Sequence, residues 1–343
     1  MRFLLDAEQR EFARSLDGLL ASSDTPSVAR SWASGDSGPG RALWGRLAET
    51  GVFALAVPER YEGLGGPGLL PVELTVAFEA LGRHAVPGPL VETVAAAALL
   101  GRLGDAAPAA GLPGLASGKT MATLCVTDTS PYALDADAAN AVYVVEGAEG
   151  MDGEHGVRGG SLRLAEGHGP VQASADPARR LSRPGGGGTV LTRGPQVASA
   201  AAYARDTAAL VTAAQALGLG RALLERTVVY VKQRTQFGAA IGTFQAVKHR
   251  LADTLLALEF AAPLLHGAAL ALAAEAPSAG AETAAAKVAA GEAAYRAART
   301  ALQLHGAVGY TEELDLSHWI RKARPLRDAW GTPAACRARV LRG

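Results

Sequence analysis

The strongest constraint on the fold is the long helical character of the C-terminal part of the chain. Three segments there are rich in Ala and Leu, namely residues 201–233, 245–272 and 281–304. Pro277 and other turn residues mark the boundaries between them, and Pro263 is expected to kink the second segment. Long helices that follow one another in this way predict a helical bundle.

The N-terminal part also has a helical pattern, with shorter segments. Helices are expected over residues 4–20, 41–49, 73–83 and 91–103. The stretch 24–40 is rich in Ser, Gly and Pro and is predicted to be a loop. A second turn-dense loop is expected at 58–68.

The pattern changes near residue 114, where short segments rich in β-branched residues begin. Strands are predicted at 120–127 and 140–145, and shorter ones at 162–164, 171–173 and 189–192. Four glycines at 185–188 lack the following helix and lysine of a phosphate-binding loop and are predicted to form a flexible turn. The chain therefore predicts an α+β, mostly α fold: an N-terminal helical domain (1–113), a small β domain (114–196) and a C-terminal helical bundle (197–343).

Composition narrows the possible functions. The formal net charge is zero, which leaves no electrostatic signature for nucleic acid or an anionic membrane. Uninterrupted apolar runs such as 94–100 are too short to span a bilayer, and the charged N-terminus does not look like a signal peptide. Cys125 and Cys336 lie far apart, outside any metal-binding spacing. A cytoplasmic protein without a metal site is expected.

Several motifs resemble the acyl-CoA dehydrogenase family, in the order in which that family has them. The matching segments are 57–65, 79–90, 176–181, Arg234-Thr235-Gln236-Phe237-Gly238 with the FQA run at 244–246, and the segment QLHGAVGY at 303–310. They extend over nearly the whole chain. The resemblance implies the family's fold with a four-helix C-terminal bundle, FAD as cofactor and an acyl-CoA as substrate in lipid metabolism.

In that family, the matching C-terminal motifs contact the flavin of a neighbouring subunit. An arginine offers a fixed fork of donors to the anionic pyrophosphate of FAD, and glycines permit close backbone approach. The resemblance assigns the cofactor contacts here to Arg234, Gln236, Phe237, Gln303, Leu304, Gly306, Ala307 and Thr332. Taken alone, Arg234 could equally be a surface cation at a helix end.

The family's catalytic base is missing from its usual place. The reaction needs a carboxylate to remove the α-proton of the thioester, commonly the glutamate of a YEGT segment. The matching segment here is DAWGT, so that Trp330 stands at the glutamate position, and an indole cannot accept the proton. The alternative position on the helix before the RxQFG motif corresponds to Ala208.

Two acids lie near these positions. Asp206 and Asp328 are candidates for a relocated base, although an ion pair with Arg324 or Arg327 is the more ordinary explanation of Asp328. His249 and His305 are expected to be packed or solvated histidines, because neither position is an acid or base in the family.

The predicted β domain departs from the family as well. Residues 126–131 keep little of the family's TEPxxGSD-like segment, and no tryptophan lies between Trp44 and Trp319 to provide its Trp-Ile-Thr segment. The motifs that would hold a chain's own flavin are therefore lost, whereas those given to a neighbour remain. The domain also looks shortened.

Three hypotheses follow. The first is a non-catalytic, flavin-supporting subunit of a heterotetrameric acyl-CoA dehydrogenase, whose partner is a homologous subunit; the family has such complexes in actinobacterial steroid side-chain breakdown. The second is a self-sufficient flavoenzyme, assembled with copies of itself, with Asp328 or Asp206 as base. The third is a flavin-free biosynthetic or binding protein on the same fold.

Overall fold

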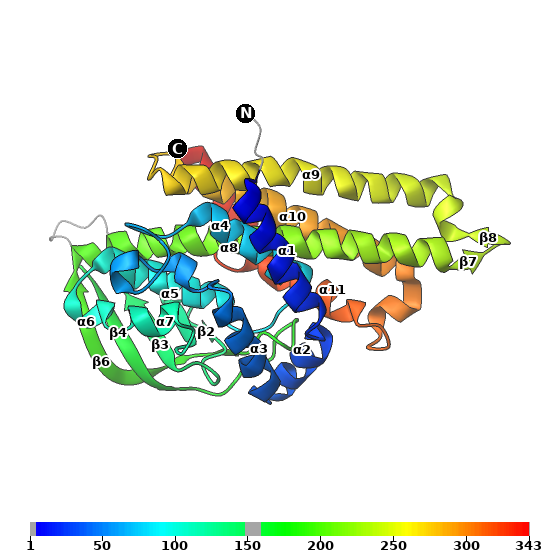
Figure 1. The fold of residues 1–343 in the computed structure, drawn as a ribbon. Helices are drawn as coiled ribbons and strands as arrows, with labels where there is room; N and C mark the ends of the chain where they lie inside the picture. Colours follow the sequence, from blue (N-terminus) through cyan, green and yellow to red (C-terminus); the bar gives the residue numbers. More distant parts are fainter. Residues whose placement is uncertain (1–4, 148–158, 343) are drawn as a thin grey trace. The chain divides into compact units, whose positions relative to one another are not determined.

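A computed structural model describes residues 5–147 and 159–342 of the chain (Figure 1). The chain folds into two compact units, each assembled from segments that are separated in the sequence. The first unit comprises Met1–Ser27, Thr75–Val86 and Ala209–Gly343, and the second comprises Val28–Leu74 and Pro87–Ala208.

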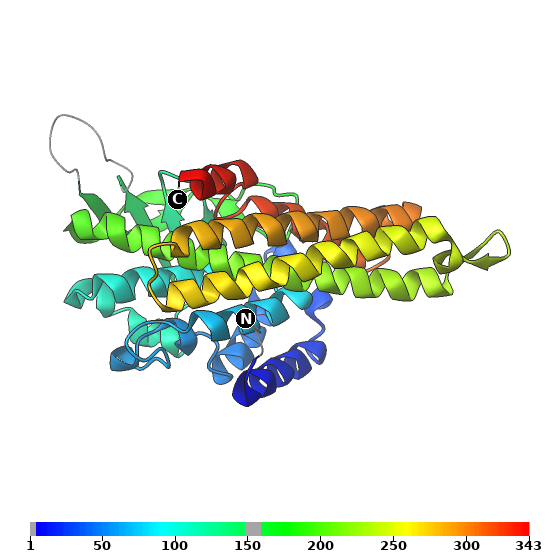
Figure 2. The same ribbon diagram turned by 90° about the horizontal axis from the view of Figure 1, so that it is seen from above.

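The first unit is built almost entirely from helices. It contains α1 (Ala7–Ala21), most of α4 (Pro71–Arg83), the later part of α8 (Pro195–Gln233), α9 (Gln245–Ala273), α10 (Ala279–His305), α11 (Leu316–Asp328) and α12 (Pro333–Arg342). The helices α9 and α10 run side by side in both ribbon views (Figures 1 and 2). The predicted helix 245–272 continues through Pro263.

Small residues pack the first unit tightly around one large side chain. Trp319 on α11 is fully buried among alanines and leucines of α8 and α10. Its indole Nε1 donates to Arg83 O at 2.8 Å, so that its only polar atom is satisfied. The helices α4 and α8 also cross very closely at Gly82. A Cβ added there would lie 1.9 Å from Gln215 O, so only glycine fits. The high alanine and glycine content therefore serves close helix packing.

The second unit combines helices with a small sheet. Its helices and turns are most of α2 (Thr25–Ser34), α3 (Gly38–Glu49), η1 (Ala54–Ala56), η2 (Glu59–Tyr61), α5 (Leu90–Leu103), α6 (Ala106–Ala109) and α7 (Leu112–Ala116). The main sheet has the order β1-β3-β4-β6, with β1 (Ala122–Val126), β3 (Ala141–Glu146), β4 (Gly160–His168) and β6 (Pro184–Gly194). The strands β2 (Ala133–Leu134) and β5 (Leu181–Ser182) form a separate pair. The structure thus confirms the predicted α+β, mostly helical fold.

The predicted turn at the four glycines is wrong. Residues 185–188 belong to β6, which pairs antiparallel with β4. The guanidinium of Arg163 on β4 donates to Gly185 O at 2.8 Å and to Gly187 O at 2.9 Å. Pairing and this arginine therefore hold in a strand a sequence whose local preference is for a turn.

The predicted loop at 24–40 is also wrong, because most of it is helical. The helix α2 buries Val28, Ala29 and Trp32, whose spacing of one and three residues places them on a single helical face. Ser27 and Ser34 lie on the exposed face of α2, and Gly35 follows its end. The predicted strand at 171–173 is reduced to one isolated bridge between Gln172 and Leu181.

Two described helices, α8 and α9, are long and apolar enough to cross a membrane by length and hydropathy alone. Polar residues interrupt each apolar stretch, so a search for uninterrupted runs misses both. The most apolar window of α8 is 94% buried, as in a helix at the centre of a folded domain, whereas that of α9 is 39% buried. The absence of a membrane span therefore stays a prediction.

Candidate functional site

The RTQFG motif forms a tight hairpin directly after α8. The strands β7 (Thr235–Gln236) and β8 (Ala239–Ala240) pair antiparallel around Phe237 and Gly238, which have φ angles of +52° and +77°. Two consecutive positive φ angles in a two-residue loop are characteristic of a type I′ hairpin turn. Figure 1 shows this hairpin projecting beyond the ends of α8 and α9.

The side chains at the hairpin are exposed. Phe237 is 93% exposed, and its ring lies edge-on to that of Phe244, with ring centroids 6.4 Å apart. The guanidinium of Arg234 is exposed and has no hydrogen-bond or ion-pair partner among the described residues. A fully exposed aromatic ring beside an unpaired guanidinium is suited to binding a ligand or partner that has an apolar face and an anionic group.

The second motif lies against the first through a buried histidine. The helix α10 ends at His305 and is followed by the turn η4 (Gly306–Tyr310). The His305 ring stacks on Tyr230 of α8 at a centroid distance of 4.0 Å, and Tyr230 Oη donates to His305 O at 3.5 Å. This contact brings the end of α10 to the end of α8, which carries Arg234.

His305 acts as a packing residue, as the sequence predicts. Its Nδ1 lies 2.8 Å from Ala301 O, which can only accept, so this nitrogen carries the proton. Burial lowers the pKa of His305, which keeps the ring neutral. His249 is exposed on α9 and is solvated.

The turn after His305 exposes backbone rather than side chains. Gly306 has a φ of +63°, and a Cβ added to it would meet no atom within 4 Å. Gly306 and Ala307 are exposed, as is Gln303, while Leu304 is half-buried. The glycine thus provides a left-handed turn with open space around it, where a ligand can approach the main chain.

Trp330 lies in a strained loop between α11 and α12. Its φ of +54° is rare for a bulky residue, and Gly331 follows with a φ of +134°. The indole is half-buried. Thr332 caps α12, since its Oγ1 accepts from Ala335 N at 3.3 Å.

A buried lysine that sequence reasoning missed holds this loop. Lys287 of α10 is 1% exposed. Its Nζ donates to Leu326 O at 3.0 Å, to Arg327 O at 2.9 Å and to Gly331 O at 3.4 Å. The first two are terminal carbonyls of α11 that have no partner within the helix, and a cation is favourable at that end. Lys287 therefore holds the backbone in place both before and after Trp330.

Both aspartates that are candidates for a relocated base interact with other groups of the protein. Asp328 is exposed, and its Oδ1 lies 3.5 Å from Arg327 Nη1, which confirms the predicted ion-pair interpretation. Asp206 is half-buried on α8 and interacts with a neighbouring group. Ala208 is fully buried and carries no ionisable group.

The segment 126–131 folds back on its own sheet. Thr127 Oγ1 donates to Val145 O at 3.1 Å, and Thr129 Oγ1 donates to Val126 O at 2.9 Å. Both hydroxyl protons are therefore used within the β sheet, although the resemblance would place cofactor-binding donors here. The hydrogen bonds of this segment therefore differ from those that the family motif would make.

Models of the acyl-CoA dehydrogenase family match both ends of the chain. The N-terminal domain model matches residues 6–119, and the C-terminal domain model matches residues 198–343. The two matches leave out residues 120–197, which contain the strands β1 to β6.

Similar proteins extend over the whole chain. It is 34% identical to acyl-CoA dehydrogenase IpdE2 of Mycobacterium tuberculosis over 92% of this chain and 91% of that protein. The identity to IpdE2 of Mycolicibacterium smegmatis is 30%, over 95% and 96% of the two chains. The solved ChsE4-ChsE5 complex from Mycobacterium tuberculosis contains a chain with the same fold, at a TM-score of 0.81 and 22% identity, covering 100% and 98% of the two chains. The chain therefore belongs to the acyl-CoA dehydrogenase family.

Proposed function

We propose that this chain is the non-catalytic subunit of an FAD-dependent, hetero-oligomeric acyl-CoA dehydrogenase and supplies flavin contacts to a homologous partner. The observation that carries the proposal is Trp330, which stands where the family keeps its catalytic glutamate. An indole N–H donates hydrogen bonds and cannot remove the α-proton of an acyl thioester. The partner subunit would therefore supply the base.

The exposed motifs fit the part of FAD that a neighbouring subunit would hold. Arg234 offers an unpaired guanidinium fork to the pyrophosphate, and the open space at Gly306 lets FAD approach the main chain of the turn. Phe237 would cover the flavin against water, with Gln236 beside it on the hairpin. When bound, FAD supplies the acceptor for the hydride that leaves the β-carbon of the acyl group.

An exposed apolar stripe on α9 supports assembly with another chain. Leu256, Phe260 and Leu264 are spaced by four residues and are 53%, 73% and 46% exposed. This spacing places them on one face of the helix, and a contiguous exposed apolar face is typical of a protein–protein interface. The ChsE4-ChsE5 complex, whose chains differ in name, supports a hetero-oligomer rather than a homo-oligomer.

The contact of Asp328 with Arg327 disfavours a self-sufficient enzyme. We expect Asp328→Asn and Asp206→Asn, each made in the co-expressed complex, to leave kcat for acyl-CoA oxidation within about twofold of the unmodified complex. Steady-state turnover with an artificial electron acceptor measures this. A drop of roughly 100-fold or more in either variant, with flavin retained, would identify a relocated base in this chain. The matched control is Asp36→Asn, which changes an exposed aspartate in the loop before α3.

A further inference from the structure

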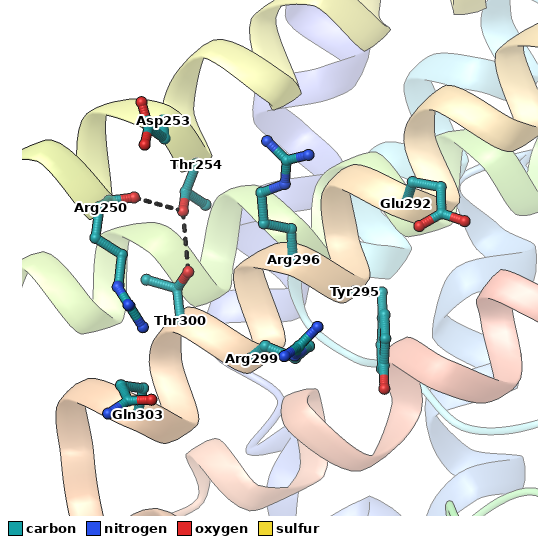
Figure 3. A pocket seen from close by; sticks show the side chains of 9 residues that line it. All are labelled: Arg250, Asp253, Thr254, Glu292, Tyr295, Arg296, Arg299, Thr300 and Gln303. Atoms are coloured by element: carbon teal, nitrogen blue, oxygen red, sulfur yellow. Dashed lines mark hydrogen bonds between the residues drawn. The ribbon is translucent and has the colours of Figure 1, made fainter.

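A groove of about 440 Å³ lies between α9 and α10 (Figure 3). Its lining residues are almost all polar or charged: Arg250, Asp253, Thr254, Glu292, Tyr295, Arg296, Arg299, Thr300 and Gln303. All of them belong to two neighbouring helices of the first unit. Gln303, which belongs to this lining, lies three residues before Gly306 on α10.

The groove carries an excess of unpaired positive charge. Glu292 is neutralised by Arg327 at 2.8 Å and lies 3.5 Å from Arg337. The guanidinium groups of the three lining arginines form no ion pair with any described residue; they are Arg250, Arg296 and Arg299. Asp253 is the one remaining lining acid, so the groove is cationic on a chain whose formal net charge is zero.

Two threonine hydroxyls at the floor of the groove already donate their protons within the protein. Thr254 Oγ1 donates to Arg250 O at 2.8 Å, and the buried hydroxyls of Thr254 and Thr300 lie 3.1 Å apart. Since the Thr254 proton is used, Thr300 must donate to Thr254. A compact phosphate on this floor would meet only hydroxyl lone pairs, so recognition of an anion falls to the arginines, Tyr295 and Gln303 of the lining.

The arginines are spread out rather than converging on a point. Figure 3 shows Arg250 reaching from α9 towards Gln303, while Arg296 rises away from α10 and Arg299 turns towards Tyr295. One small anion cannot engage three such groups together. Several carboxylates along an extended segment can, each meeting a guanidinium fork.

We infer that the groove between α9 and α10 docks a carboxylate-bearing segment of the partner acyl-CoA dehydrogenase subunit. The inference rests on the proposed function, because the same partner would use the flavin contacts at the adjoining Gly306 turn. Docking here would place the partner against the end of α10 and add charge selectivity to the apolar contact of α9.

Charge reversal in the co-expressed complex tests this inference. The test variant combines Arg250→Glu, Arg296→Glu and Arg299→Glu, all exposed positions where folding is not at stake. The control variant makes the same change in net charge elsewhere, with Arg10→Glu, Lys119→Glu and Arg193→Glu, which are also exposed. The partner tested is a homologous acyl-CoA dehydrogenase chain from the same genome, and sedimentation velocity measures assembly while flavin absorbance is recorded.

We expect the groove variant to raise the dissociation constant of the complex roughly 100-fold and the control variant to change it less than about threefold. The unmodified complex should weaken between about 0.05 M and 0.5 M NaCl, and the groove variant should lose most of this salt dependence.

A yellow unmodified complex that the groove variant forms equally well would overturn the inference and leave the proposed function standing. Saturable binding of ADP or inorganic phosphate to the chain alone, lost in the groove variant while assembly is unchanged, would make the groove a small-anion site instead. An unmodified chain that forms no complex with a homologous acyl-CoA dehydrogenase chain contradicts the proposed function, and the docking inference with it.

Discussion

Replacing Arg234 by Ala is expected to weaken FAD binding by the co-expressed complex by roughly 10- to 150-fold. The guanidinium is exposed, has no partner among the described residues and follows the last turn of α8. A charge-assisted hydrogen bond to an anionic pyrophosphate contributes about 1.5–3 kcal/mol, and alanine removes it entirely. Fluorescence titration of the flavin-stripped complex with FAD measures the dissociation constant.

Two further variants separate charge and geometry at this position. Arg234→Lys keeps the charge and loses the planar fork, so its dissociation constant should lie between those of the unmodified complex and Arg234→Ala. Lys232→Ala is the matched control, an exposed cation two residues earlier, in the last turn of α8. Unchanged FAD affinity in Arg234→Ala would remove the arginine from the cofactor site.

Replacing Lys287 by Met should lower the free energy of unfolding by about 3–5 kcal/mol. Methionine keeps most of the buried aliphatic volume but leaves the carbonyls of Leu326, Arg327 and Gly331 without their donor. An unsatisfied buried carbonyl costs about 1–3 kcal/mol, and the two shorter contacts alone account for the expected loss. Urea denaturation at one fixed protein concentration measures it.

The same substitution should have a local effect on the Trp330 loop. Amide hydrogens at Ala329 and Cys336, bonded to Pro325 O and Thr332 O, should exchange faster in Lys287→Met before global unfolding occurs. Lys248→Met, at an exposed position of α9, is the control and should change the free energy of unfolding by less than about 0.5 kcal/mol. Equal stability of Lys287→Met and the unmodified chain would contradict the role assigned to the ammonium group.

Much of the fold is predictable because long helices and buried strands have strong periodic signals. The helices α8, α9 and α10 lie where runs of Ala and Leu predict them, and β1 and β3 match runs of β-branched residues that are buried on both faces.

Local composition misleads where tertiary contacts decide the conformation. The glycines at 185–188 are extended because β4 and Arg163 satisfy their backbone. The helix α2 forms because Val28, Ala29 and Trp32 share a buried face, although the surrounding residues favour a loop.

The candidate site also contains residues that the sequence points to and one that it does not. Arg234 and Phe237 stand out in the sequence because they belong to a motif, and the structure leaves both exposed after a helix end, while their flavin contacts stay a prediction. Lys287 could not be recognised with the same ease, since a lysine in an alanine-rich helix usually projects into solvent. A signal does exist: Lys287 lies on the helix face of Thr283, Ala290 and Ala294, all of which are buried.

The absorbance spectrum of the purified chain, alone and after co-expression with a homologous acyl-CoA dehydrogenase chain from the same genome, tests the proposed division of labour most directly. A subunit that holds only the neighbour's half of the site should be colourless and inactive alone, and the complex should show the flavin spectrum together with acyl-CoA oxidation. A yellow, active chain in the absence of any partner would contradict the proposal.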